Sequence, residues 1–311
     1  MALFNKDSRG SEELNDLTGF FHADNRFENI AAEIELATTE VAALVGRGVI
    51  DRAEADYKAG THSGFVKMVQ LPVACLAISR YFKLLGVSHG DSGRKLKIDA
   101  NEKIPFEWML DRDDRAMHEK YCRALDALYT YLEHEDIEEW RESDVRRSLA
   151  ESIVRTLIDF ERVYPIEHSY YTYFMLLPLI IEVQNSRLRK TLGDAWPRIS
   201  GPAGEEADRG ILYFAQRVAV LYAVITAVER WSIEVFPQSI ARRFMPTYQG
   251  DRASKTAAVG EMDWYLSRLR AQAAEAMEDL VAAINGNDNP YKDYPLLPEN
   301  EKRKKYFNAG V

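Results

Sequence analysis

Three carboxylates lie close together in the stretch DRDDR, where Arg112 separates Asp111 from Asp113 and Asp114, and Arg115 follows. Carboxylates three or four residues apart share one face of a helix, and their oxygens are the ligands that Mg²⁺ prefers. The arginines interrupt this acidic run. A solvated helix face with local ion pairs is therefore the favoured interpretation, and a magnesium-dependent helical enzyme remains an alternative.

The other reactive side chains form no recognised catalytic pattern. The six histidines occur without a HExxH motif and without the paired Glu-x-x-His motifs of di-iron bundles. The segment HGDSG, residues 89–93, lacks the Gly-x-Ser-x-Gly spacing of a hydrolase nucleophile turn and instead predicts a glycine-rich turn. We therefore expect no catalytic residue, no metal ligand and no cofactor.

A basic and aromatic segment, EKRKKYF, lies near the end of the sequence at residues 301–307. Such a segment suits either nucleic acid or a protein partner. The chain as a whole is acidic, with a net charge of -9, and this favours a protein-docking arm. The candidate interaction residues in this arm and in the glycine-rich loop are Asp91, Ser92, Gly93, Tyr291, Tyr294, Lys302, Arg303, Lys304, Lys305, Tyr306 and Phe307.

Composition is that of a globular protein, with 46% hydrophobic and 29% charged residues among 311. Cys75 and Cys122 each fall in a helical pattern and are expected to be small buried apolar residues. No uninterrupted apolar run reaches the roughly 18 to 20 residues of a membrane span. The beginning of the sequence lacks the apolar core of a signal peptide. We expect synthesis in a reducing, cytoplasmic compartment and no membrane association.

The elements that must position these residues are helices. Apolar residues at three-and-four spacing predict a helix over 27–45, which Gly46 closes. A second, mostly apolar helix covers 65–85, and a polar loop with a small hairpin or extended segment follows it. A third helix begins near Pro105 and Phe106 and continues to about Leu132. The fold class is therefore all-α.

The second half of the sequence resembles the first. Phe27 aligns with Phe174 at an offset of 147, Gln70 with Gln216 at 146, and Trp108 with Trp264 at 156. These matches keep the order of the predicted helices, which indicates an internal duplication. The predicted fold is two tandem three-helix repeats joined by a connecting helix, with a loop or hairpin insertion and an extended C-terminal arm.

This pattern divides the chain into five parts. Residues 1–26 form an N-terminal arm and 27–135 the first repeat. Residues 136–172 form the connecting segment, whose helix is expected to end before Pro165. Residues 173–286 form the second repeat and 287–311 the extended arm, which is rich in proline and aromatic residues.

Three stretches carry a resemblance to a known family. These are ALFN at the start, GVSHGDSGRKLKIDANEKIPFEW at residues 86–108, and RTLIDFERVYPI at residues 155–166. Over almost its whole length the chain resembles an uncharacterised protein family encoded in prophages of Bacteroidetes bacteria. Each repeat is also faintly similar to the helical head-to-tail connector, or adaptor, proteins of tailed phages. The second repeat lacks the GDSG loop.

The resemblance implies a structural protein of the virion, without catalytic residues, that forms a ring beneath the portal. Its implied partners are its own copies, the portal and tail proteins, and DNA that passes through without sequence-specific binding. The implied location is the virion. A prophage-encoded helical module that binds other proteins is the first alternative, and the magnesium-dependent enzyme is the second.

Overall fold

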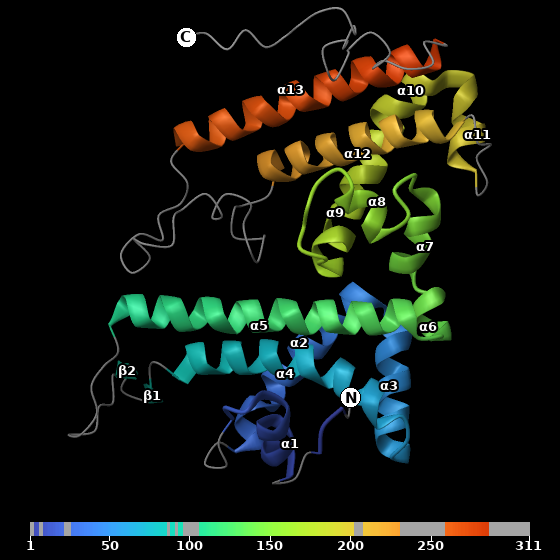
Figure 1. Cartoon of the computed structure of the whole chain (residues 1–311). Coiled ribbons are helices and arrows are strands. Elements are labelled where there is room, and N and C mark those ends of the chain that lie inside the picture. Colours follow the sequence, from blue (N-terminus) through green and yellow to red (C-terminus); the bar gives the residue numbers. More distant parts are fainter. Residues whose placement is uncertain are drawn as a thin grey trace, which may run out of the picture. The chain divides into compact units, whose positions relative to one another are not determined.

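A computed structural model of the chain describes residues 3–5, 9–21, 26–85, 88–90, 93–95, 106–201, 208–230 and 259–285. In these residues the fold is all-α apart from one two-stranded hairpin, as predicted (Figure 1). The chain forms two compact units. Of the described residues, those within 3–151 and 165–178 and Arg230 belong to the first unit, and those within 152–164, 179–229 and 259–285 belong to the second.

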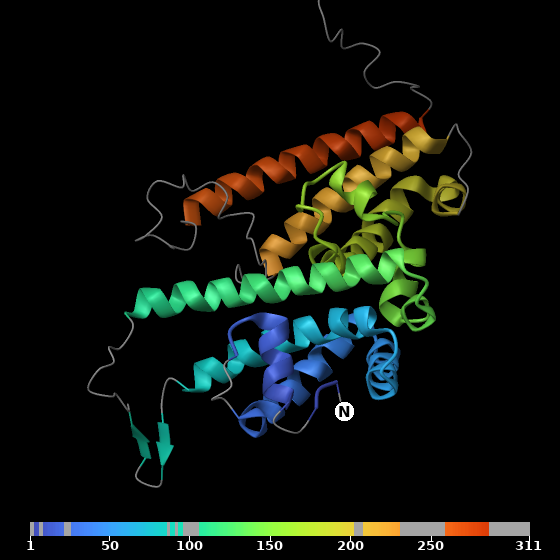
Figure 2. The same ribbon diagram turned by 60° about the horizontal axis from the view of Figure 1, so that its bottom comes forward.

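The first unit is built around one apolar helix. Its larger elements are α1 (Arg9–Thr18), α2 (Phe27–Val45), α3 (Arg47–Ala59), α4 (Ser63–Leu85) and α5 (Glu107–His134). Helices α1, α2, α3 and α5 all pack on α4 (Figures 1 and 2). Because α4 has neighbours on several sides, it is apolar around most of its circumference and carries no single apolar stripe.

The described residues between 27 and 135 form four helices rather than the predicted three. Helix α3 was missed because Gly46 and Gly48 indicated only the end of α2. Gly46 does end α2, with φ of 94° and its N–H bonded to the Ala42 carbonyl. The chain then starts a new helix immediately, because Val49, Ile50 and Ala53 bury one face of α3 completely.

The prediction of an N-terminal arm over 1–26 was also wrong for the described residues. This segment contains α1, and Leu14 and Phe21 are fully buried. Leu3 is 3% exposed, and its carbonyl accepts a hydrogen bond of 2.5 Å from Gln70 Nε2 on α4. The apolar residues of this segment therefore belong to the core of the first unit.

The segment predicted as one connecting helix is broken into short pieces. Residues 136–172 contain α6 (Glu138–Arg141), α7 (Asp144–Glu151), α8 (Leu157–Glu161) and the start of α9 (Tyr170–Val183). Thr156 ends the non-helical stretch as the N-cap of α8, where its Oγ1 accepts a hydrogen bond from the Asp159 N–H. Helix α9 continues from the first unit into the second, with the boundary after Pro178.

Two glutamine side chains form hydrogen bonds with the non-helical segment between α7 and α8. The Ile153 N–H donates to Gln184 Oε1 at 3.0 Å, and the Ile153 carbonyl accepts from Gln216 Nε2 at 2.9 Å. Ile153 is 3% exposed, so a helical alternative would leave both buried glutamine amides without these partners. We call Ile153, Gln184 and Gln216 the glutamine clasp.

The second unit also contains the π-helix η1 (Gln184–Leu188), α10 (Arg189–Leu192), the 3-10 helix η2 (Gly193–Ala195), α11 (Trp196–Ser200), α12 (Arg209–Arg230) and α13 (Val259–Ile284). Ion pairs join the last two helices: Arg217 Nη1 lies 2.9 Å from Asp279 Oδ2, and Arg270 Nη2 lies 2.6 Å from Glu229 Oε1.

Candidate interaction surface and pocket

The start of α5 extends beyond the helix on which it packs. Lys83 Nζ, in the last turn of α4, lies 3.4 Å from Asp114 Oδ2 of α5. The residues of α5 before Asp114 therefore continue for about 10 Å past this contact, at 1.5 Å per residue. Figures 1 and 2 both show α5 extending past the end of α4. We call residues 106–113 the α5 overhang.

The overhang exposes large apolar side chains. Phe106 is 67% exposed, Trp108 48%, Met109 41% and Leu110 51%. Leu84 and Leu85, in the last turn of α4, are 55% and 53% exposed. Full burial of one such side chain is worth about 1.5–3 kcal/mol, and several large apolar side chains exposed around one end of a helix mark a candidate interaction site. The overhang is therefore the strongest candidate surface for a protein partner.

The acidic run DRDDR lies on the same part of α5. Asp111 and Asp113 are exposed, whereas Asp114 forms the ion pair with Lys83. No group of three or more His, Cys, Asp or Glu side chains in the described part of the chain could hold a metal ion. The ion pair supports the interpretation of this run as a solvated helix face.

The second unit has a differently surrounded tryptophan at the matching position. Trp264 is 57% exposed, and the Arg268 guanidinium carbon lies 5.6 Å from the centre of its ring. Asp263, Ser267 and Arg268 are exposed polar neighbours. The next two residues, Tyr265 and Leu266, are half-buried, so no run of exposed apolar side chains follows Trp264, whereas Met109 and Leu110 after Trp108 are both exposed.

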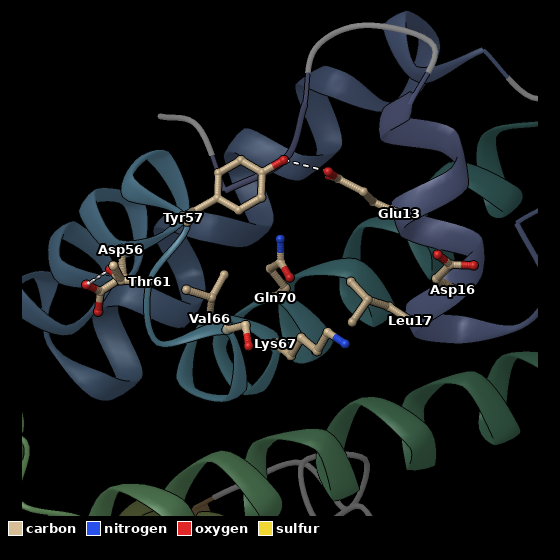
Figure 3. A pocket seen from close by; sticks show the side chains of 11 residues that line it. Glu13, Asp16, Leu17, Asp56, Tyr57, Thr61, Val66, Lys67 and Gln70 are labelled. Atoms are coloured by element: carbon tan, nitrogen blue, oxygen red, sulfur yellow. Dashed lines mark hydrogen bonds between the residues drawn. The ribbon is translucent and has the colours of Figure 1, made fainter.

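A pocket of about 350 Å³ lies between α1, the end of α3 and the start of α4 (Figure 3). Two of its carboxylates, Glu13 and Asp56, have hydrogen-bond partners. Glu13 Oε1 accepts from the Tyr57 hydroxyl at 2.6 Å, and Glu13 Oε2 accepts from the Asn5 N–H at 3.0 Å. Burial and the nearby Glu13 carboxylate raise the pKa of Tyr57.

The carboxylate on the opposite side of the pocket, Asp56, also has hydrogen-bond partners. Asp56 Oδ1 accepts from Thr61 Oγ1 at 3.0 Å and lies 3.0 Å from His62 Nδ1, and the hydrogen bond with His62 lowers the pKa of Asp56. The Glu13 carboxylate and Asp56 Oδ1 are thus occupied by neighbouring side chains, whereas Asp56 Oδ2 is buried without a hydrogen-bond partner among the described residues. These side chains join α1 to the turn between α3 and α4 rather than converge on an open position for a substrate.

The cysteines are buried, as predicted. Cys122 Sγ lies 3.7 Å from His118 Nε2, which is the arrangement of a potential thiol–imidazole pair. Burial raises the pKa of Cys122 to about 12 and lowers the pKa of His118. At neutral pH the thiol keeps its proton, so this pair lacks the thiolate that a cysteine nucleophile requires.

The predicted interaction residues are mostly outside the described part of the chain. The hairpin expected in the glycine-rich loop is present: β1 (Ser88–Gly90) pairs antiparallel with β2 (Gly93–Lys95), and Gly90 pairs with Gly93. The other ten candidates lie outside the described residues, namely Asp91, Ser92, Tyr291, Tyr294, Lys302, Arg303, Lys304, Lys305, Tyr306 and Phe307.

The α5 overhang was not among the predicted interaction residues. Its sequence signal was FEWML, in which four of five consecutive residues are apolar, immediately before the acidic run. Trp108, Met109 and Leu110 are three consecutive apolar residues and cover about 200° of the helix circumference, which is wider than the stripe that one packed face requires.

Within the described residues, two helices pass the length and composition criteria for a membrane span, although the search for uninterrupted apolar runs predicted none. They are α4 and α12, and within their most apolar windows 50% and 61% of residues are buried. The core helix of a soluble protein passes the same test. Since α4 is the central helix of its unit and Arg217 of α12 pairs with Asp279, packing explains both compositions.

No protein-family model, curated protein or solved structure matches this chain.

Proposed function

We propose that this protein is a structural protein of a phage or prophage virion, a head-to-tail connector that assembles with its own copies beneath the portal. The observation that carries the proposal is the α5 overhang, where four large apolar side chains are 41% to 67% exposed. An isolated chain gains nothing from this surface, whereas an assembled one buries it against a neighbour. The family resemblance of the sequence supplies the virion context.

The arrangement of polar groups agrees with a structural role. At the pocket of the first unit, Glu13 accepts a hydrogen bond from Tyr57 and Asp56 accepts one from Thr61. On α5, Asp114 forms an ion pair with Lys83. These contacts rigidify helices. Rigid helical bodies with an apolar contact surface are what a closed ring of identical subunits requires.

We also infer that the two aligned parts of the sequence, residues 27–135 and 173–286, arose by internal duplication. In each unit a buried glutamine of the apolar helix donates Nε2 to the carbonyl of a buried upstream residue: Gln70 to Leu3, and Gln216 to Ile153. The two glutamines are the pair that the sequence alignment matched. Shared placement of such a specific bond supports common descent more strongly than helical content does.

The test is the mass and shape of the purified full chain, measured by light scattering and negative-stain microscopy over a wide concentration range. Rings of about six to twelve chains are expected from closed cyclic symmetry. A monomer at every concentration would contradict self-assembly and favour a prophage-encoded module that binds a different protein.

A further inference from the structure

We infer that the α5 overhang is the docking site for the C-terminal arm, residues 287–311, of a neighbouring copy. This inference rests on the proposed self-assembly and identifies the two surfaces that meet. The receptor consists of Phe106, Trp108, Met109 and Leu110, with the exposed Asp111 and Asp113 beside them.

The arm has the composition that this receptor requires. It contains the apolar pair Leu296 and Leu297 and the aromatic pair Tyr306 and Phe307, and it carries four consecutive cations at residues 302–305. Apolar side chains of the arm would cover those of the overhang, while the cations would lie near Asp111 and Asp113.

The electrostatic part of the contact is limited by the overhang itself. Arg112 and Arg115 interrupt the acidic run, and Asp114 is paired with Lys83. The helix N-terminus also carries a partial positive charge, which does not favour cations in its first turn. Apolar burial must therefore supply most of the affinity, and we expect added salt to weaken binding only a few-fold.

The arm is long enough to reach another molecule. Helix α13 ends at Ile284, and the 26 residues from 286 to 311 could span up to about 90 Å when extended. A compact unit of about 150 residues has a radius of gyration of only about 15 Å. The extended length of the arm therefore permits a contact between copies.

The direct test measures binding of a fluorescent synthetic peptide, residues 287–311, by anisotropy. The receptor is a full-length variant whose own arm is disabled by replacing residues 302–305 with Glu and Leu296, Leu297, Tyr306 and Phe307 with Ser. We expect Trp108→Ser in this receptor to weaken binding by about 10- to 100-fold, as loss of one buried apolar side chain implies. Trp264→Ser is the matched control, and we expect a change below about twofold because Trp264 lies on α13 and is not part of the proposed receptor.

Equal binding by the Trp108→Ser receptor and its parent, or no binding by the parent, would overturn the inference. Trp108 lies on the overhang, so its replacement should leave the helical circular dichroism unchanged. Met109→Ser provides a second receptor variant if Trp108→Ser fails to fold.

A mixing experiment separates contact between copies from contact within one chain. Full-length Trp108→Ser retains the arm but lacks the receptor, and the arm-disabled chain retains the receptor but lacks the arm. Co-assembly of the mixture, when neither variant assembles alone, supports docking on a neighbour. Peptide binding without rescue by mixing would place the arm on its own chain and contradict the inference.

The two proposals fail in different ways. A monomeric wild-type chain whose disabled-arm variant still binds the peptide through Trp108 would refute self-assembly but keep the docking site. Ring formation by the wild-type chain, together with equal peptide binding by the Trp108→Ser receptor and its parent, would support self-assembly and refute the docking site.

Discussion

Replacing Gln216 by Leu should destabilise the second unit through a single backbone group. In the glutamine clasp, Gln216 Nε2 is the donor to the Ile153 carbonyl at 2.9 Å, and Ile153 is only 3% exposed. Leucine fills a similar volume but cannot donate. The carbonyl would remain buried without this partner, at a cost of about 1–3 kcal/mol.

The companion change, Gln184→Leu, removes the acceptor for the Ile153 N–H and should cost a similar amount, because Gln184 is 1% exposed. Both side chains hold the same peptide segment. Once one is lost the segment can move, so we expect the double variant to cost less than the sum of the single variants by about 0.5 kcal/mol or more.

Two measurements check this prediction. Urea unfolding gives the loss of stability, and hydrogen exchange with mass spectrometry should show faster exchange in a peptide covering residues 152–156. The control is Gln272→Leu on α13, where the glutamine is exposed and the change should stay within about 0.5 kcal/mol. If Gln216→Leu costs no more than Gln272→Leu and leaves exchange at residues 152–156 unaltered, the reasoning about the clasp is refuted.

Three further predictions concern the first unit. Trp140 is 1% exposed against Tyr129 and Phe174, so Trp140→Ala should cost about 3–5 kcal/mol in urea unfolding; a cost below about 1 kcal/mol would contradict this packing. Burial raises the pKa of Asp126, so its contribution to stability is present below its unfolded pKa and is lost as pH rises through its folded pKa. Asp126→Asn should therefore gain stability relative to wild type between pH 3 and pH 7, and a pH-independent difference in unfolding midpoint would refute this. Burial also raises the pKa of Cys75 to about 11. Both cysteines should react with Ellman's reagent at neutral pH only after unfolding, and rapid reaction of the native chain would show that they are accessible.

The long helices could be predicted from the sequence because their signals are local. Gly46 ends α2 where the spacing predicted, and α5 begins at Glu107, directly after the Pro105–Phe106 pair. Periodic apolar residues and terminal residues lie within one or two helical turns of each other, so no distant contact is needed to interpret them.

The break between α7 and α8 could not be predicted, because its cause is distant. The residues from Val145 to Phe160 keep helical spacing, yet Ile153 is held by glutamines 31 and 63 residues away. Tertiary hydrogen bonds outweigh the local preference at this point. Likewise, α1 belongs to the core because it packs on α4. The polar residues around it in the sequence did not indicate this contact.

The candidate surface was hidden in the sequence for a similar reason. FEWML reads equally well as the buried start of a helix or as an exposed one. The relative positions of α4 and α5 decide the outcome: the contact between Lys83 and Asp114 fixes where the last turn of α4 lies along α5. The apolar residues before Asp114 are left uncovered by α4, and only the packed structure shows this.

The most direct test of the central claim compares the masses of wild type and Trp108→Ser by light scattering at the same concentration. The account predicts assemblies of about six to twelve wild-type chains and a markedly smaller mass for the variant. A wild-type chain that stays monomeric, or a variant that assembles as fully as wild type, would contradict the claim that this protein builds its assembly through the exposed start of α5.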